Sequence, residues 1–196
     1  MEERIKRELT EAMLVTQTLL NKHIQDIAAV TQLVLNAYQN GGRLIIFGNG
    51  GSAADAQHIA AELVNYQYIP NRPMLDALAL TVNTSVLTAI GNDIGYENVF
   101  ARQIESLVTE KDVIIALSTS GNSINVIKGI EAAKKTGAKV IGLTGKTGGK
   151  LATMDLDFLI KVPSTDTARI QEAHIKIGHI MCSLVEKELF QQKRFA

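Results

Sequence analysis

Five short apolar segments, separated by longer segments with helical periodicity, constrain the fold of this 196-residue chain more than any other feature. The segments lie at residues 43–47, 77–81, 113–117, 139–143 and 157–162. They read as largely continuous apolar runs, which is typical of strands buried on both faces. Helical segments between such strands indicate a parallel sheet with helices on both sides. We therefore expect one α/β domain built on a single doubly wound five-stranded parallel sheet.

Long helical segments flank this alternating region. Residues 4–39 place apolar side chains at helical spacing until Asn40-Gly41-Gly42 ends the pattern, and residues 166–190 form a long closing helix. We expect residues 1–40 to be a helical N-terminal extension and residues 41–196 to be the main structural unit. These helices are longer than is needed to cover a sheet of five strands. Either they form a layer between the subunits of a homo-oligomer, or they pack on their own sheet.

The charge balance excludes several classes of partner. Twenty basic residues match twenty acidic ones, which argues against general electrostatic binding of nucleic acid or an anionic membrane surface. No apolar run is long enough to cross a bilayer, and the charged N-terminal segment lacks the apolar core of a signal peptide. The single cysteine, Cys182, cannot form an internal disulfide. We expect a cytoplasmic protein with no nucleic-acid or membrane partner.

Two loops rich in small and hydroxyl residues are expected at the binding edge of the sheet. Ligands of open parallel sheets bind beyond the carboxyl ends of the strands, where the strand order reverses. For the flavodoxin-like order 2-1-3-4-5, the loops at that point are GNGGS at 48–52 and STSGNS at 118–123. The second loop precedes a helix N-terminus, which favours an anion. It contains no lysine or arginine, so it fits a monophosphate better than a triphosphate with magnesium. The alternative is a hydroxyl-capped turn that binds nothing.

The first loop resembles a dinucleotide-binding fingerprint only in part. Residues 48–53 match the pattern G-x-G-x-x-[G/A], but that fingerprint also requires an acidic residue about 20 positions further on, after the second strand. The chain reads TVN at 81–83, with no carboxylate. Ser52 and Asp55 instead form a capping pattern that predicts a helix start at this point. We therefore expect no nucleotide cofactor.

Two polar sets lie on the helices nearest these loops. His58 and Glu62 are four residues apart and share one helix face, either as a surface contact or as part of a site. The closing helix carries RIQEAHIKIGHI at 169–180. In it, Gln171 and His179 are separated by about 12 Å along the helix axis, whereas metal–ligand bonds are about 2 Å long. If Gln171 and His179 serve one site, we expect them to come from different subunits.

Several segments together make the chain resemble the SIS (sugar isomerase) domain family. They are GNGGSAADAQHIAAEL at 48–63, GND at 91–93, STSGNSINVIKGI at 118–130, LTGKTGGK at 143–150 and RIQEAHIKIGHI. The resemblance covers nearly the whole chain and is closest to members that interconvert sedoheptulose 7-phosphate and D-glycero-D-manno-heptose 7-phosphate. It implies an aldose–ketose isomerase that acts through an enediol, at the first step toward nucleotide-activated heptose for lipopolysaccharide or related glycans. It also implies a cytoplasmic homotetramer with active sites between subunits and one zinc ion per subunit.

The resemblance implies roles for individual residues as well. Glu62 and His179 match the acid/base pair; a carboxylate can take a carbon-bound proton, and an imidazole can move protons on oxygen. The implied metal ligands are His58, Glu62, Gln171 and His179. The implied substrate contacts are Asn49, Gly50, Gly51, Ser52, Glu62, Asn92, Asp93, Ser118, Thr119, Ser120, Ser123 and Gln171.

One departure from the family pattern bears on the substrate. Many members read T-G-R-Y after the helix that carries Glu62, but this chain reads VNYQY at 64–68 and has no arginine until Arg72, which could substitute. Two other functions stay open at this point. One is a non-enzymatic SIS protein that binds the replication initiator DnaA, and the other is an isomerase of a different sugar phosphate. Retention of both Glu62 and His179 favours an enzyme.

Overall fold

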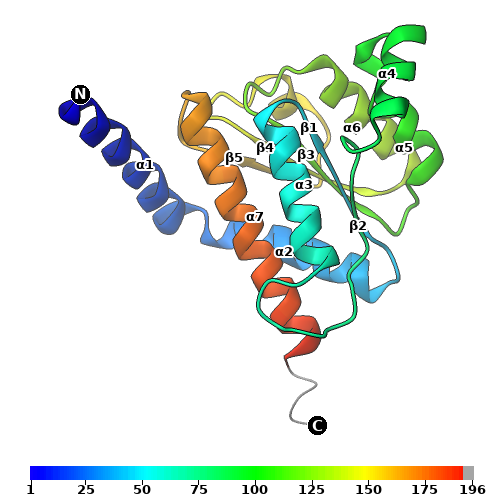
Figure 1. Ribbon diagram of the computed structural model, residues 1–196, viewed down its shortest axis with the longest axis horizontal. Helices are drawn as coiled ribbons and strands as arrows, with labels where there is room; N and C mark the ends of the chain where they lie inside the picture. The colour runs from blue at the N-terminus through cyan, green and yellow to red at the C-terminus, as the bar shows by residue number, and fades with distance from the viewer. Residues whose placement is uncertain (192–196) are drawn as a thin grey trace.

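The computed structural model, which describes residues 1–191, contains one five-stranded parallel sheet with the strand order β2-β1-β3-β4-β5. Both the fold class and the predicted strand order are confirmed (Figure 1). The strands are β1 (Leu44–Gly48), β2 (Ala77–Ala79), β3 (Val113–Ser118), β4 (Lys139–Thr144) and β5 (Phe158–Lys161).

Helices cover both faces of this sheet. The helices of residues 1–191 are α1 (Glu2–Lys22), α2 (Ile24–Gln39), α3 (Gly51–Val64), α4 (Thr84–Asp93), α5 (Ala101–Leu107), α6 (Ile124–Thr136) and α7 (Thr167–Phe190), with short 3₁₀ turns η1 (Tyr96–Asn98) and η2 (Gly149–Thr153). Side chains alternate between two cores along β1: Leu44 and Ile46 pack toward α2, α3 and α7, and Ile45 and Phe47 pack toward α5 and α6. The continuous apolar strands are thus explained by burial on both sides.

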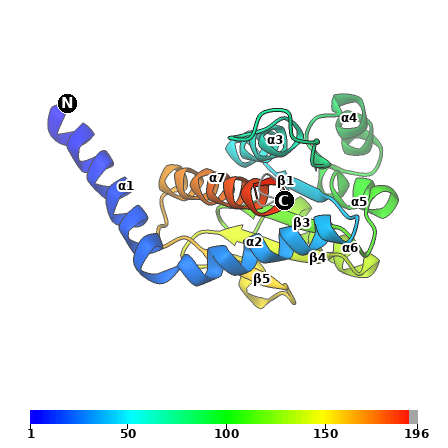
Figure 2. The ribbon, with the colours of Figure 1, turned by 90° about the horizontal axis from the view of Figure 1, so that it is seen from below.

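The N-terminal helical pattern is divided into two helices. The helical pattern of residues 4–39 is interrupted at His23, whose Nδ1 lies 2.7 Å from Asp26 Oδ2. Helix α1, which precedes this break, points away from the sheet (Figures 1 and 2). Ile5, Leu9 and Met13 on α1 are more than half exposed. Among residues 1–191, no helix combines the length and the apolar character needed to cross a membrane.

The start of α3 differs from the capping pattern expected at Ser52 and Asp55. The helix begins one residue earlier, at Gly51, and its N-cap residue is Gly50 with a φ of 56°. A positive φ at this point is readily adopted only by glycine. Ser52 therefore lies inside the first turn, where it is buried, and no side chain caps the helix.

Candidate active site

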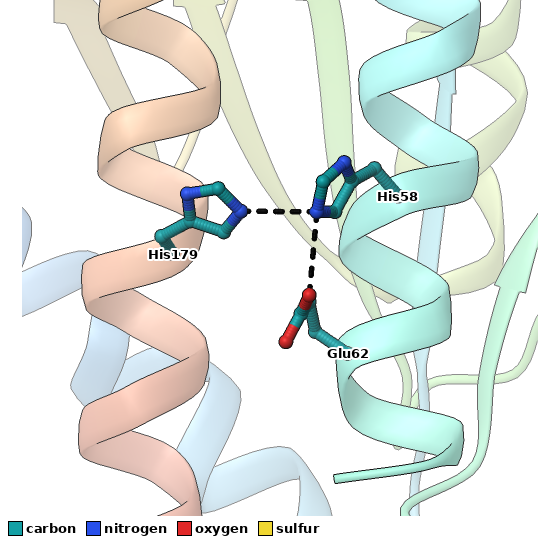
Figure 3. A group of neighbouring side chains, drawn as sticks. All are labelled: His58, Glu62 and His179. Atoms are coloured by element: carbon teal, nitrogen blue, oxygen red, sulfur yellow. Dashed lines mark hydrogen bonds and ion pairs between the residues drawn. The ribbon is translucent and has the colours of Figure 1, made fainter. Parts of the chain in front are cut away.

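Three side chains from two helices converge beside the sheet. His58 and Glu62 come from α3 and His179 from α7, and they point toward one another (Figure 3). The Nε2 atoms of the two histidines are 3.0 Å apart, and His58 Nε2 is 3.3 Å from Glu62 Oε1. The side chain of His58 is half exposed, so solvent or a ligand can reach this cluster. A hydrogen bond between two imidazole nitrogens requires that one carries a proton and the other offers a lone pair.

The close approach of α3 and α7 depends on a glycine next to His179. A Cβ atom added at Gly178 would lie 2.6 Å from Cδ1 of Ile59, a residue with no exposed surface. Ile59 is the neighbour of His58 in sequence, just as Gly178 is the neighbour of His179. The absence of a side chain at Gly178 therefore lets the two helices approach closely enough for the imidazoles to meet.

The His58, Glu62 and His179 cluster has the composition of a metal site. One ligand atom from each residue lies within 4.8 Å of the others. Two imidazole nitrogens and one carboxylate oxygen form a donor set that divalent transition metals accept, and three protein ligands leave a position open for another group. The three residues can therefore hold a metal ion or carry out proton transfer.

Asp55 lies one helix turn before His58 on the same helix. Burial raises the pKa of the Asp55 carboxyl, and the nearby His58 partly opposes that rise. Its Oδ2 atom is buried and has no hydrogen-bond donor among residues 1–191. The sequence pattern assigned Asp55 to helix capping, but the structure places it beside the histidine cluster.

Gln171 lies apart from this cluster within the chain. A Cβ atom added at Gly51 would lie 2.5 Å from Nε2 of Gln171, so the glutamine side chain rests on the first residue of α3. His179 follows eight residues later on the same unbroken helix, about 12 Å further along its axis. Gln171 thus belongs to the glycine-loop end of the α3–α7 pair, and His179 to its middle.

The loop at 118–123 connects the carboxyl end of β3 to the N-terminus of α6. Ser118 Oγ and Ser123 Oγ are 3.1 Å apart, and Ser120 Oγ accepts a hydrogen bond from the backbone N–H of Asn122. Ser123 occupies the N-cap position of α6, but its side chain makes no capping hydrogen bond. The alternative of a hydroxyl-capped turn therefore does not describe Ser123. Its hydroxyl and the helix N-terminus are available to an anion.

A pair of amide side chains joins the two loops. Asn49 and Asn125 exchange two hydrogen bonds of 2.8 Å each, from each Nδ2 to the other Oδ1. Asn125 also accepts the backbone N–H of Val126 in the first turn of α6. Asn125 is not among the site residues expected from the sequence. Its only sequence signal is an amide residue two positions after the serine-rich loop.

The remaining expected substrate residues occupy several places. Gly50 and Gly51 lie at the exposed start of α3, and Thr119 accepts the backbone N–H of Gly145 through its carbonyl oxygen. Asn92 and Asp93 end α4, where Asn92 Nδ2 donates to Asp93 Oδ1. Within residues 1–191, no side-chain hydrogen bond joins Asn92 or Asp93 to either loop.

Arg72, the first arginine after the helix that carries Glu62, is buried within the chain. Its side chain is 1% exposed and lies 3.6 Å from Glu186 of α7, measured from Nε to Oε1. The guanidinium therefore faces the C-terminal ends of α3 and α7, away from both loops.

Comparisons with known proteins show which family this chain resembles. A sequence model of the SIS domain matches residues 9–145. A phosphoheptose isomerase of Aneurinibacillus thermoaerophilus is 52% identical over 93% of this chain and 89% of the relative. The structure of phosphoheptose isomerase GmhA from Neisseria gonorrhoeae aligns with a TM-score of 0.88 at 42% identity, over 95% of this chain and 98% of the other. A phosphoheptose isomerase structure from Francisella tularensis aligns with a TM-score of 0.91 at 33% identity, over 94% and 97% of the two chains.

Proposed function

Because the chain belongs to the SIS domain family, we propose that its two loops and the His58, Glu62 and His179 cluster form the active site of a phosphoheptose isomerase. The reaction interconverts sedoheptulose 7-phosphate and D-glycero-D-manno-heptose 7-phosphate. The observation that carries this proposal is the cluster itself, in which acid/base side chains from two helices meet. Relatives that cover nearly all of the chain support the substrate class.

The layout of the site fits a sugar that carries its phosphate far from the reacting carbons. The phosphate is on C7, whereas the proton moves between C1 and C2. His58 lies seven residues after Gly51 on α3, about 10 Å along the helix from the glycine loop. We propose that Ser118, Thr119, Ser120 and Ser123 hold the phosphate, while Asn49, Gly50, Gly51 and Ser52 contact the sugar together with Asn92 and Asp93.

Glu62 and His179 supply the proton transfers in this proposal. In the ketose-to-aldose direction, the Glu62 carboxylate removes a proton from C1, and the resulting enediol receives a proton at C2. His179 gives a proton to O2 as the enediol forms, so that the C2 carbonyl is lost, and takes a proton from O1 as C2 is protonated, so that the C1 carbonyl forms. Positioned groups of this kind each contribute about 10²–10⁴-fold to a rate.

We further propose that the cluster binds zinc through His58, Glu62 and His179, with Gln171 as a fourth ligand. The two histidines and the carboxylate fit zinc in their donor atoms. A bound zinc ion would polarise the sugar carbonyl. Glu62 cannot act freely as a base while it is tightly bound to metal, so we expect chelation to lower activity less than loss of Glu62 does. Turnover measured before and after dialysis against a chelator, with zinc content determined in parallel, checks this.

We propose a homotetramer with active sites between subunits. An apolar groove between α1, α2 and α7 supports this, lined by Leu19, Leu20, Ile24, Ile180 and Leu184. The projecting helix α1 adds further exposed apolar side chains, and such surfaces mark association sites. Because Gln171 and His179 are far apart on one helix, we propose that the Gln171 ligand comes from another subunit.

The cellular setting completes the proposal. We place the enzyme in the cytoplasm, at the first step toward nucleotide-activated heptose for lipopolysaccharide or another glycan.

We also divide the chain into a helical extension at 1–40 and an SIS unit at 41–196, of which residues 192–196 lie outside the described part. The balanced charge of the sequence gives no support to nucleic-acid binding.

A substrate panel tests the proposed function against its alternatives. Purified protein is incubated with sedoheptulose 7-phosphate, hexose 6-phosphates and an amino-sugar phosphate, and the products are identified by NMR. We expect turnover of sedoheptulose 7-phosphate in preference to the others. Turnover of another sugar phosphate alone would reassign the substrate. A lack of all turnover, together with capture of the replication initiator in a pull-down, would favour the non-enzymatic alternative.

A further inference from the structure

A buried ion pair lies beyond the His58, Glu62 and His179 cluster, where α3 ends against α7. It consists of Arg72, in the segment that follows α3, and Glu186 of α7, and each side chain is only 1% exposed. Burying two charges has a large desolvation cost, so such a pair is weak evidence for stability by itself. Its other contacts indicate what it does.

Arg72 holds the last turn of α3, including the backbone of Glu62. Its Nη2 donates to the carbonyl oxygen of Glu62 at 3.0 Å and to that of Leu63 at 2.7 Å. Carbonyl groups in the last turn of a helix have no partner within the helix. The guanidinium also lies over the ring of Phe190, 5.5 Å from its centroid. Arg72 therefore connects the main chain of Glu62 directly to α7.

Glu186 holds the segment that leaves α3. Its carboxylate accepts the backbone N–H groups of Gln67 at 2.8 Å and Tyr68 at 3.1 Å, and also that of Ile69. Glu186 follows His179 by seven residues, or nearly two helix turns, so both side chains lie on the same side of α7. The side of α7 that presents His179 to the cluster thus also anchors the end of α3.

We propose that Arg72 and Glu186 form a positioning pair, which sets the separation of Glu62 and His179 by fixing the end of α3 against α7. Among residues 1–191, the hydrogen bond of Arg72 to Glu62 goes to its main chain, so the pair acts through Glu62 and His179 and does not touch the substrate. This inference rests on the proposed isomerase function for its kinetic test, but the geometric test below is independent of that function.

Two conservative substitutions remove the contacts while preserving size. Arg72→Lys keeps the positive charge, but one ammonium cannot reproduce the planar fork that reaches two carbonyl groups and a carboxylate. Glu186→Gln keeps the shape and one acceptor oxygen, but loses the negative charge.

Asp112→Asn is the matched control. Asp112 is also a buried carboxylate, which accepts the backbone N–H groups of Arg43 and Thr109 and lies 3.9 Å from Arg43 Nε. It directly precedes β3, at the amino-terminal end of the strand, whereas the two loops lie at the carboxyl ends of the strands.

The kinetic test compares the three variants well below their unfolding temperatures. We expect Arg72→Lys and Glu186→Gln to lower kcat by about 10–100-fold, because small displacements of catalytic groups have effects of this size. KM for sedoheptulose 7-phosphate should change by less than about twofold, since substrate contacts are retained. Asp112→Asn should lower the unfolding temperature with kcat nearly unchanged. The inference is wrong if Arg72→Lys and Glu186→Gln lose thermal stability but keep kcat.

Crystal structures of the wild type and Arg72→Lys provide the second readout. We expect the His58–His179 and His58–Glu62 contacts, 3.0 Å and 3.3 Å in the structure described above, to widen in the variant. An unchanged cluster would overturn the inference, even if the wild type turned over no phosphoheptose. A wild type without turnover but with a widened cluster in the variant would instead refute the proposed function and support the positioning role.

Discussion

Replacing Gly178 with alanine perturbs the contact between α3 and α7 without altering any residue of the candidate site. The new Cβ would lie 2.6 Å from Ile59 Cδ1 and 2.7 Å from Ile59 Cγ1. Favourable contacts between carbon atoms begin at about 3.5 Å, so about 1 Å of separation is missing. Because Ile59 has no exposed surface, its side chain cannot turn into solvent. The clash must therefore be relieved in part by an increase in the separation between α3 and α7.

The expected size of the effect follows from that missing separation. Overpacking of a core costs about 1–3 kcal/mol, and each kcal/mol lowers the unfolding temperature of a chain of this length by about 2–4 °C. A displacement of about 1 Å at His179 relative to His58 and Glu62 should lower kcat by up to about 100-fold. Both quantities are measurable, by thermal unfolding and by isomerase kinetics.

Two further variants separate a site effect from a packing effect. Gly129→Ala is the matched control, because its Cβ would lie 2.9 Å from the ring of Phe47 on the opposite face of the sheet. It should lower the unfolding temperature with little loss of kcat. Adding Ile59→Ala to Gly178→Ala removes both clashing atoms and should recover kcat, although the protein stays less stable.

If Gly178→Ala and Gly129→Ala lower the unfolding temperature equally and both keep wild-type kcat, the separation of the two helices does not control the cluster.

The remaining predictions concern the phosphate loop and a buried histidine. The double variant Ser120→Ala plus Ser123→Ala should raise KM for the phosphorylated sugar at least tenfold, because hydrogen bonds to charged groups contribute about 1.5–3 kcal/mol each; an unchanged KM would place the phosphate elsewhere. Burial lowers the pKa of His174 to about 4, so the unfolded chain binds a proton at this histidine that the folded chain does not. The free energy of unfolding should therefore fall by about 3 kcal/mol as the pH falls from 6.5 to 4. In His174→Gln this part of the pH dependence should disappear. Denaturant unfolding of both proteins at several pH values checks this. An identical pH dependence in both proteins would contradict the attribution of this stability loss to His174.

The sheet could be predicted from the sequence because each strand is buried on both faces. Segments such as LIIF at 44–47 and VIIAL at 113–117 are continuous apolar runs bounded by loops, and their order followed from the general rule for doubly wound sheets. The break at His23 could not be predicted, since no glycine or proline marks it and the apolar spacing continues across it. The start of α3 was misplaced because Gly50 shapes that turn through its backbone alone.

The candidate site was predictable only where its residues are neighbours in sequence. His58 and Glu62 share a helix face by spacing, but the contact of His58 with His179 spans 121 positions and depends on how α7 packs. The family resemblance supplied that connection. The burial of Arg72 could not be predicted, because nothing in the local sequence indicates that Glu186 of α7 is buried against it.

The most direct test of the central claim is isomerisation of sedoheptulose 7-phosphate in deuterated water, followed by NMR. We predict that the wild type forms D-glycero-D-manno-heptose 7-phosphate with deuterium at C2. We also predict that Glu62→Gln, folded and assembled like the wild type, forms none. A wild type without turnover would contradict the proposed function, and a Glu62→Gln variant with nearly full turnover would remove Glu62 from the mechanism.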